Sequence, residues 1–71
     1  MASTPSVPAR FIRVKEVLSL TALSQSDLYR RIAAGTFPKQ INLGPMTVVW
    51  LEDEVRAWMD SRVADARGVA A

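Results

Sequence analysis

The residues best placed to do chemistry are the cations of residues 24–35, which read SQSDLYRRIAAG. At about 100° per residue, a helix here would turn Leu28 and Ile32 to one side and Arg30 roughly to the other. Small residues share the outer side, and they would let long cationic side chains approach a polyanion closely. The alternative is that the two adjacent arginines are ordinary solvated surface charges. The rest of the chain must decide between these interpretations.

Both ends of this helix are marked in the sequence. Ser24 is a good N-cap, because its hydroxyl can accept from a backbone N–H one turn on, and Asp27 follows at the spacing of a capping box. Gly35 suits the position after the last turn, where a left-handed conformation ends a helix. The residues that we expect on the exposed face and its flanks are Ser26, Tyr29, Arg30, Arg31 and Ala33.

The composition narrows the classes of function. The 71 residues contain no cysteine and no histidine, so the chain offers no disulfide, no zinc site of the usual ligands and no Ser-His or Cys-His pair. We therefore expect a protein that is not an enzyme and that needs no metal, cofactor or small-molecule ligand. The lack of cysteine fits a reducing compartment, and no apolar run is long enough for a membrane span or a signal peptide. We expect a cytoplasmic protein without membrane contact.

The net charge of +2 is unevenly spread. Residues 10–50 hold six basic and two acidic residues, a balance of +4, whereas residues 51–71 hold three basic and five acidic residues, a balance of −2. A polyanionic partner would be steered to the first part of the chain and repelled by the second.

The chain is short enough to form one domain, which we place at residues 11–67. Residues 1–10 contain two prolines and no periodic apolar pattern, so we expect a disordered arm. An arm that enters a DNA minor groove is the alternative, although Arg10 is its only arginine. Residues 68–71 should form a frayed tail.

The segment 11–20 predicts a first helix of about two turns, which Phe11 and Ile12 enter in an extended conformation. Val17 lies on its apolar side and Lys15 on its polar side. A link of about three residues then leads to the cap at Ser24. Two short amphipathic helices joined in this way form a helix-turn-helix, although many such corners bind nothing.

The pattern changes after Gly35. Pro38 cannot continue a helix, and an alternating segment, 41–43, and a β-branched run that ends at Trp50, 47–50, flank a Gly-Pro turn. A hairpin directly after a helix-turn-helix is a wing. It is marginal alone, so it should lean on the helices through apolar residues. The residues expected to make this contact are Phe37, Ile41, Val48 and Trp50.

The segment 51–66 has the longest helical pattern. Its first turn holds the acidic residues 52–54, which we interpret as complementing the helix dipole and not as a metal or acid–base site. We interpret Trp58 and Met59 as core residues. The apolar stripe of this helix consists of Leu51, Val55, Trp58, Met59 and Val63.

The ordered set of these features resembles the AlpA family of small phage and prophage regulators, relatives of the excisionases and of the DNA-binding domain of the MerR regulators. The resemblance covers about residues 11–60. The matching residues are Lys15-Glu16-Val17, Leu23-Ser24, Tyr29 with Arg30, Gly35-Thr36-Phe37-Pro38, Leu43-Gly44, Trp50-Leu51, Glu54-Val55 and Trp58.

The resemblance implies a mainly α winged helix-turn-helix with three helices and a two-stranded wing. Its second helix would enter the major groove of double-stranded DNA, and the wing would lie on the adjacent backbone or minor groove. It also implies a transcriptional regulator or an excisionase, that is, a recombination directionality factor, with an integrase or RNA polymerase as a further partner.

Two departures from the family pattern concern the wing. Many relatives carry a proline after the position of Lys39 and a cation near the wing tip, whereas this chain has Gln40 and a Pro45-Met46-Thr47 tip. We therefore expect the helix, more than the wing, to form the DNA surface. The wing could instead contact a neighbouring protomer through Met46.

We expect a sequence-specific double-stranded DNA-binding protein that assembles in several copies on repeated sites. A protein-binding adaptor that does not bind DNA is the competing interpretation. RNA binding would favour exposed aromatics on a sheet, and only Tyr29 is a candidate. The residues expected to contact DNA are Arg13, Lys15, Ser24, Gln25, Ser26, Tyr29, Arg30, Arg31, Ala33 and Lys39. Among these, Arg31 and Lys39 are assigned to phosphates, and Arg13 and Lys15 to the backbone beside the first helix.

Overall fold

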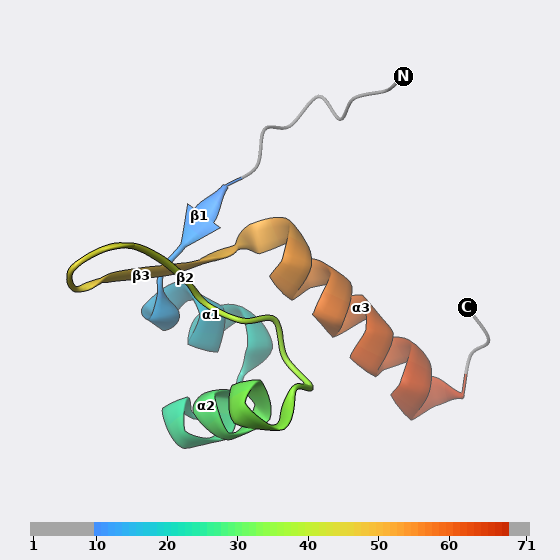
Figure 1. Cartoon of the computed structure of the whole chain (residues 1–71). Helices are drawn as coiled ribbons and strands as arrows, with labels where there is room; N and C mark the ends of the chain where they lie inside the picture. The colour runs from blue at the N-terminus through green and yellow to red at the C-terminus, as the bar shows by residue number, and fades with distance from the viewer. Residues whose placement is uncertain (1–9, 69–71) are drawn as a thin grey trace.

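The computed structural model describes residues 10–68, which form three helices and a small antiparallel sheet (Figure 1). Of the predicted arm and tail, only Arg10 and Gly68 lie within these residues. The elements are β1 (Phe11–Ile12), α1 (Val14–Thr21), α2 (Gln25–Ala34), β2 (Ile41–Gly44), β3 (Thr47–Leu51) and α3 (Glu52–Arg67). This order confirms the winged helix-turn-helix. No helix in the described part of the chain is both long and apolar enough to cross a membrane.

The sheet has one more strand than the sequence predicted. The described strands lie in the order β1-β3-β2, and β1 pairs antiparallel with β3 through Phe11 opposite Leu51 and Ile12 opposite Trp50. The extended conformation of these first residues is confirmed, but two residues are too few to show the alternation that marks a strand. The added strand gives β3 a neighbour on each side.

The turn between α1 and α2 depends on local hydrogen bonds. Thr21 donates its hydroxyl to the carbonyl oxygen of Val17 (2.8 Å) at the end of α1. Ala22 then takes a left-handed conformation with φ of 61°, and its N–H donates to the Leu18 carbonyl oxygen. The Ser24 hydroxyl accepts from the Asp27 backbone N–H (3.2 Å), which confirms the predicted N-cap. These contacts fix the angle between the two helices.

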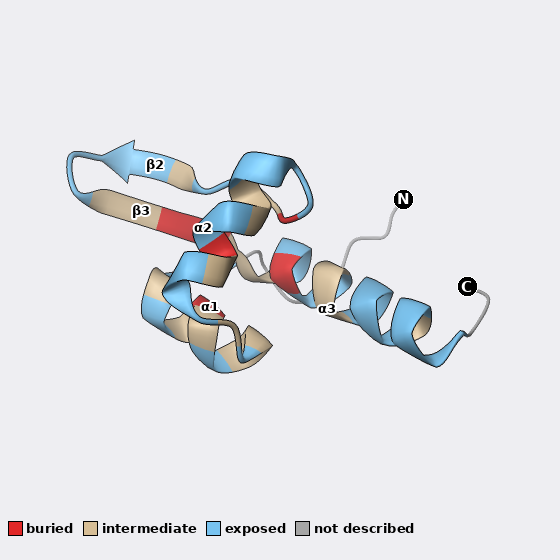
Figure 2. Cartoon of the chain, turned by 90° about the horizontal axis from the view of Figure 1, so that it is seen from below, coloured by how far each residue is buried: buried red, intermediate tan, exposed pale blue. Residues whose placement is uncertain are grey.

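The core takes residues from nearly every element. Trp50 of β3 is fully buried in this core, and the indole Nε1 of Trp50 donates to the Pro38 carbonyl oxygen (3.2 Å). Figure 2 shows buried residues on β3, on α1 and α2, and on the first part of α3. The six buried residues of this cluster are Ile12, Val17, Leu28, Phe37, Trp50 and Val55. The predicted contacts of the wing through Phe37, Val48 and Trp50 are thereby confirmed, whereas Ile41 is half-buried and does not belong to this cluster.

The first turn of α3 is tied to the segment before β1. The Glu52 backbone N–H donates to the Arg10 carbonyl oxygen (2.8 Å), and its carboxylate accepts from Arg10 Nη1 (3.2 Å). Arg56, one turn on, donates to the same carboxylate through Nε (3.0 Å) and Nη2 (2.8 Å). The hydrogen bond from Arg56 is the main cause that lowers the pKa of Glu52.

The apolar stripe of α3 ends earlier than predicted. Val55 is fully buried, and Trp58 and Met59 pack against the core, but Val63 is 48% exposed. The assignment of Val63 to the packed stripe was therefore wrong. The reason is length, because α3 has 16 residues and its second half extends beyond the other elements in both views (Figures 1 and 2).

The wing is a tight hairpin with an apolar tip. Ile41 lies opposite Val49, and the pairing shifts register between Asn42 and Gly44. Met46 in the turn has a positive φ of 65° and is 93% exposed. This side chain therefore points into solvent with no core contact of its own.

Candidate nucleic-acid interface

One side of α2 is open and the other is packed. Leu28 is fully buried and Ile32 half-buried, because the two lie nearly one turn apart on the same side of the helix. Of the residues predicted for the open side and its flanks, Ser26, Tyr29, Arg30 and Ala33 are exposed, whereas Arg31 is half-buried. Ser24 and Gln25, at the start of the helix, are exposed as well. The side chains near its middle are small, so the helix backbone can come close to a flat or grooved partner.

Arg30 projects from this face and pairs with Asp27. Its Nη2 donates to the Asp27 carboxylate one turn earlier, while the Arg30 side chain remains 75% exposed. Between residues 10 and 68 no hydrogen bond joins this carboxylate to the Ser24 backbone N–H, so only the half of the predicted capping box that Ser24 supplies is formed. An i,i+3 ion pair of this exposure contributes at most about 0.5 kcal/mol to stability. Its importance lies in where it holds the guanidinium.

Tyr29 joins the open face to the core. It is 39% exposed, and its ring centroid lies 6.5 Å from that of the buried Trp50 with the two rings tilted by 58°. An aromatic ring with one packed side and one open side is rigid at low conformational cost. Tyr29 can therefore offer a fixed contact at the edge of the face.

Arg31 is turned away from the flank predicted for it and toward α3. The side chain is half-buried, its Cζ lies 5.8 Å from the ring centroid of Trp58, and its Nε is buried with no partner among residues 10–68. This distance is within the range of a cation–π contact. The aromatic ring therefore restricts where the positive charge of Arg31 can go.

Trp58 is itself held in place from two sides. Its Nε1 donates to the Thr36 carbonyl oxygen (2.7 Å), and its ring lies 4.7 Å from that of Phe37, centroid to centroid. Thr36 in turn donates both its backbone N–H (2.9 Å) and its hydroxyl (3.2 Å) to the Arg31 carbonyl oxygen. The end of α2, the following loop and α3 are thus locked together around this tryptophan.

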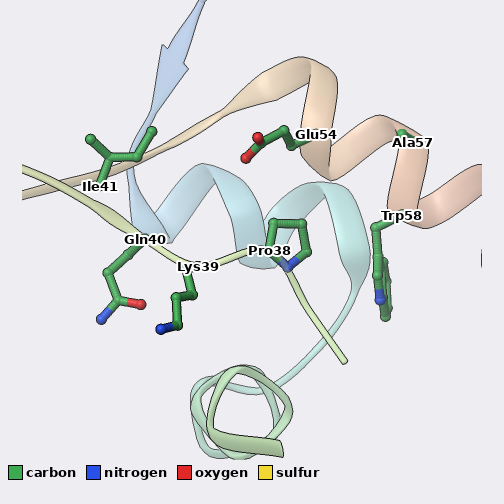
Figure 3. A pocket seen from close by; sticks show the side chains of 7 residues that line it. All are labelled: Pro38, Lys39, Gln40, Ile41, Glu54, Ala57 and Trp58. Carbon is green, nitrogen blue, oxygen red and sulfur yellow. The ribbon is translucent and has the colours of Figure 1, made fainter. Parts of the chain in front are cut away.

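Lys39 lines, together with Trp58, a hollow of about 630 Å³ between the segment before β2 and α3 (Figure 3). Apolar side chains form most of its wall. The side chains of Lys39 and Gln40 point to the same side in this view, and Ile41 points away from them. The lining residues are Pro38, Lys39, Gln40, Ile41, Glu54, Ala57 and Trp58. Trp58 thus contacts Arg31 and also lines the hollow at which Lys39 lies.

The remaining predicted residues, Arg13 and Lys15, are exposed at the start of α1. Their side chains take part in no hydrogen bond or ion pair between residues 10 and 68. Three other arginines, by contrast, have their charge balanced by carboxylates, and these are Arg10, Arg56 and Arg62. In the described chain, the cations predicted for phosphates, Arg13, Lys15, Arg31 and Lys39, are without an acidic partner. Arg67, at the end of α3, also has no acidic partner among residues 10–68, so most of the unpaired cations, but not all of them, belong to the predicted surface.

Sequence reasoning missed two residues that control the cations of α2. Asp27 was assigned to capping, although its spacing of three from Arg30 was a readable signal for an ion pair. Trp58 was assigned to the core alone. Its contact with Arg31 joins residues far apart in the chain, and no local pattern could have indicated it.

Comparison with known proteins adds three findings. Residues 10–63 match the family model described as prophage CP4-57 regulatory protein (AlpA). The chain is also 51% identical over 55 residues to a protein of Enterobacteria phage P4 described as uncharacterized protein ORF88, an alignment that covers 78% of this chain and 62% of that protein. The chain thus spans less than two thirds of that relative. No solved structure matches it.

Proposed function

Because this chain belongs to the AlpA family of prophage regulatory proteins, we propose that it is a sequence-specific regulator that binds double-stranded DNA through α2. The observation that supports this most strongly is the open face of α2, where small residues surround the exposed Arg30. A helix of this kind fits the major groove, whose base edges differ for each base pair. Residues 11–67 would form the DNA-binding domain.

In this proposal each cation has one of two tasks. Arg30 reads a base, since its guanidinium fork can donate two hydrogen bonds to the O6 and N7 of guanine. Ser24, Gln25, Ser26, Tyr29 and Ala33 line the rest of the contact. Phosphates are bound by Arg13, Lys15, Arg31 and Lys39, none of which has an acidic partner in the described chain. Phosphate contacts fix the register of the helix, and base contacts specify the sequence.

The wing has a different task in this proposal. Its tip has no cation, and Met46 is 93% exposed there. One domain of this size buries too little surface for high selectivity, so several copies would bind repeated sites. Met46 would then contact a neighbouring protomer on the same DNA.

The biological role that we propose is that of a phage-type transcriptional regulator or an excisionase acting in the cytoplasm. In the first case the protein would help or hinder RNA polymerase near its binding site, and in the second it would help an integrase to excise DNA. Both roles need the same duplex contact, so the DNA surface can be tested before the role is known.

A protein-binding adaptor is a second candidate, and one observation favours it. The hollow beside Trp58 has a mostly apolar wall that could take an apolar side chain of another protein. An adaptor of this kind would show no salt-dependent binding to duplexes. The two candidates therefore separate in a single titration.

The test is a footprint on the DNA that flanks the gene, followed by titration of the protected duplex. Arg30→Ala should abolish discrimination at one base pair, a loss of about 1–3 kcal/mol. Arg62→Ala removes the same charge from the far end of α3 and is the matched control, which should bind as the wild type does. Equal losses of Arg30→Ala on footprinted and random DNA would contradict the base-reading role.

A further inference from the structure

The N-cap residue and two residues of α2 form a chain of contacts from the helix start to its exposed arginine. The Ser24 hydroxyl accepts from the Asp27 backbone N–H (3.2 Å), which fixes the position of Asp27 in the first turn. The Asp27 carboxylate then accepts from Arg30 Nη2. Each step spans three residues, so the helix itself sets the geometry.

The pairing leaves Arg30 both restrained and available. Its side chain is 75% exposed although one of its nitrogens is bound, whereas the Asp27 side chain is only 33% exposed. A guanidinium has five N–H donors in a fixed fork, so a carboxylate that takes one leaves the others free for a base. An unrestrained arginine would have to lose its rotamer freedom when it binds.

We propose that Asp27 is a specificity-determining positioning residue, which holds the Arg30 guanidinium in the orientation that reads a guanine edge in the major groove. This inference rests on the proposed function. Asp27 does not touch DNA in this account; it acts through Arg30. Its carboxylate repels the phosphates of any duplex, which weakens binding to every sequence. On the correct sequence the contact of the positioned Arg30 with guanine outweighs this repulsion.

The two effects have opposite signs, and this makes the proposal testable. If Asp27 only complements the helix dipole, its loss weakens the helix without regard to DNA sequence. If it only opposes DNA, its loss strengthens binding to every duplex alike. Only a positioning role predicts that correct and random sequences respond in opposite directions.

The experiment uses two probes, a duplex pool selected from a random library by the wild-type chain and the unselected pool. Asp27→Asn should lower affinity for the selected pool about tenfold, equivalent to about 1.4 kcal/mol, and raise affinity for the unselected pool roughly twofold through the lost charge. Asp53→Asn, which removes the same charge from the first turn of α3, is the matched control. It should not lower affinity for either pool.

Two further variants separate positioning from folding. Asp27→Glu keeps the charge and suits the first turn but moves the carboxylate by one methylene, so it should restore part of the discrimination. In an Arg30→Ala background, Asp27→Asn should no longer reduce discrimination, because the residue that it positions is gone. Circular dichroism melts of each variant report whether the helix is intact.

The outcomes are distinct. A wild-type chain that selects no sequence would overturn the proposed function and this inference with it. A wild-type chain that selects a sequence, with Asp27→Asn shifting both pools in the same direction, would overturn the inference alone. Loss of preference at one shared base position in Asp27→Asn and Arg30→Ala would support it.

Discussion

The contact between Arg31 and Trp58 predicts a measurable coupling between α2 and α3. The Arg31 Cζ lies 5.8 Å from the ring centroid, near the outer limit of a cation–π contact, and the side chain is half-buried. Such a contact is worth about 0.5–1 kcal/mol at exposed sites and more when water is excluded. We expect a coupling free energy of about 0.5–1 kcal/mol between the two side chains.

The perturbation is a double-mutant cycle with Arg31→Met and Trp58→Leu. Methionine keeps most of the apolar stem of arginine and removes the charge. Leucine removes the ring, and with it the hydrogen bond to the Thr36 carbonyl oxygen (2.7 Å) and the contact with Phe37. Trp58→Leu should therefore be strongly destabilising by itself. Only the difference between the double variant and the two single variants isolates the contact.

The assay is urea unfolding of the wild type, the two single variants and the double variant, monitored by circular dichroism, which gives the free energy of unfolding of each protein. Trp58→Phe serves as the control, since it keeps an aromatic ring below Arg31 and loses the hydrogen bond, worth about 0.5–1.5 kcal/mol. The coupling between Arg31 and residue 58 should survive in part in that variant. Strict additivity of Arg31→Met and Trp58→Leu would refute the reasoning, because it would mean that the ring does not hold the cation.

Three other predictions concern the fold and the wing. Ala22→Gly should raise stability by about 0.5–1 kcal/mol, since φ of 61° strains alanine but not glycine, whereas Ala57→Gly inside α3 should lower the Tm. Glu52→Gln should make the Tm fall less steeply on acidification. The hydrogen bond from Arg56 lowers the pKa of Glu52 in the folded state, so the ionised carboxylate stabilises the fold fully above about pH 4.3, the value of an unfolded glutamate. This stabilisation is lost as the pH falls through the lower pKa of the folded state. Glu54→Gln removes the same charge from the same turn of α3 and is the matched control for Glu52→Gln. Met46→Asp should leave the Tm unchanged at this 93% exposed site and abolish cooperative binding to DNA with repeated sites; retained cooperativity would exclude a wing contact between protomers.

Local signals in the sequence predicted α2 well. Its cap at Ser24 and its end at Gly35 depend on contacts within a few residues, and both are found in the structure. The buried position of Leu28 follows from helical periodicity alone. The open face of α2 was therefore predictable, and with it most of the candidate site.

Contacts between distant segments were not predictable in the same way. The pairing of β1 with β3 joins residues 11 and 51, and two residues carry no periodic signal. Val63 continues the apolar pattern of α3, but the body of the domain ends before it. Arg31 turns toward Trp58, because the loop after α2 folds back onto α3. Each of these depends on the size and path of the whole fold and not on local pattern.

The salt dependence of duplex binding tests the central claim most directly. A labelled duplex from the DNA flanking the gene would be titrated by fluorescence anisotropy at about 50 to 200 mM salt. If Arg13, Lys15, Arg31 and Lys39 bind phosphates, the slope of log K against log salt should be clearly negative and no steeper than about −3.6 for one bound copy, at 0.9 for each phosphate neutralised. Absence of binding at the lowest salt, or binding that does not change with salt, would contradict the account.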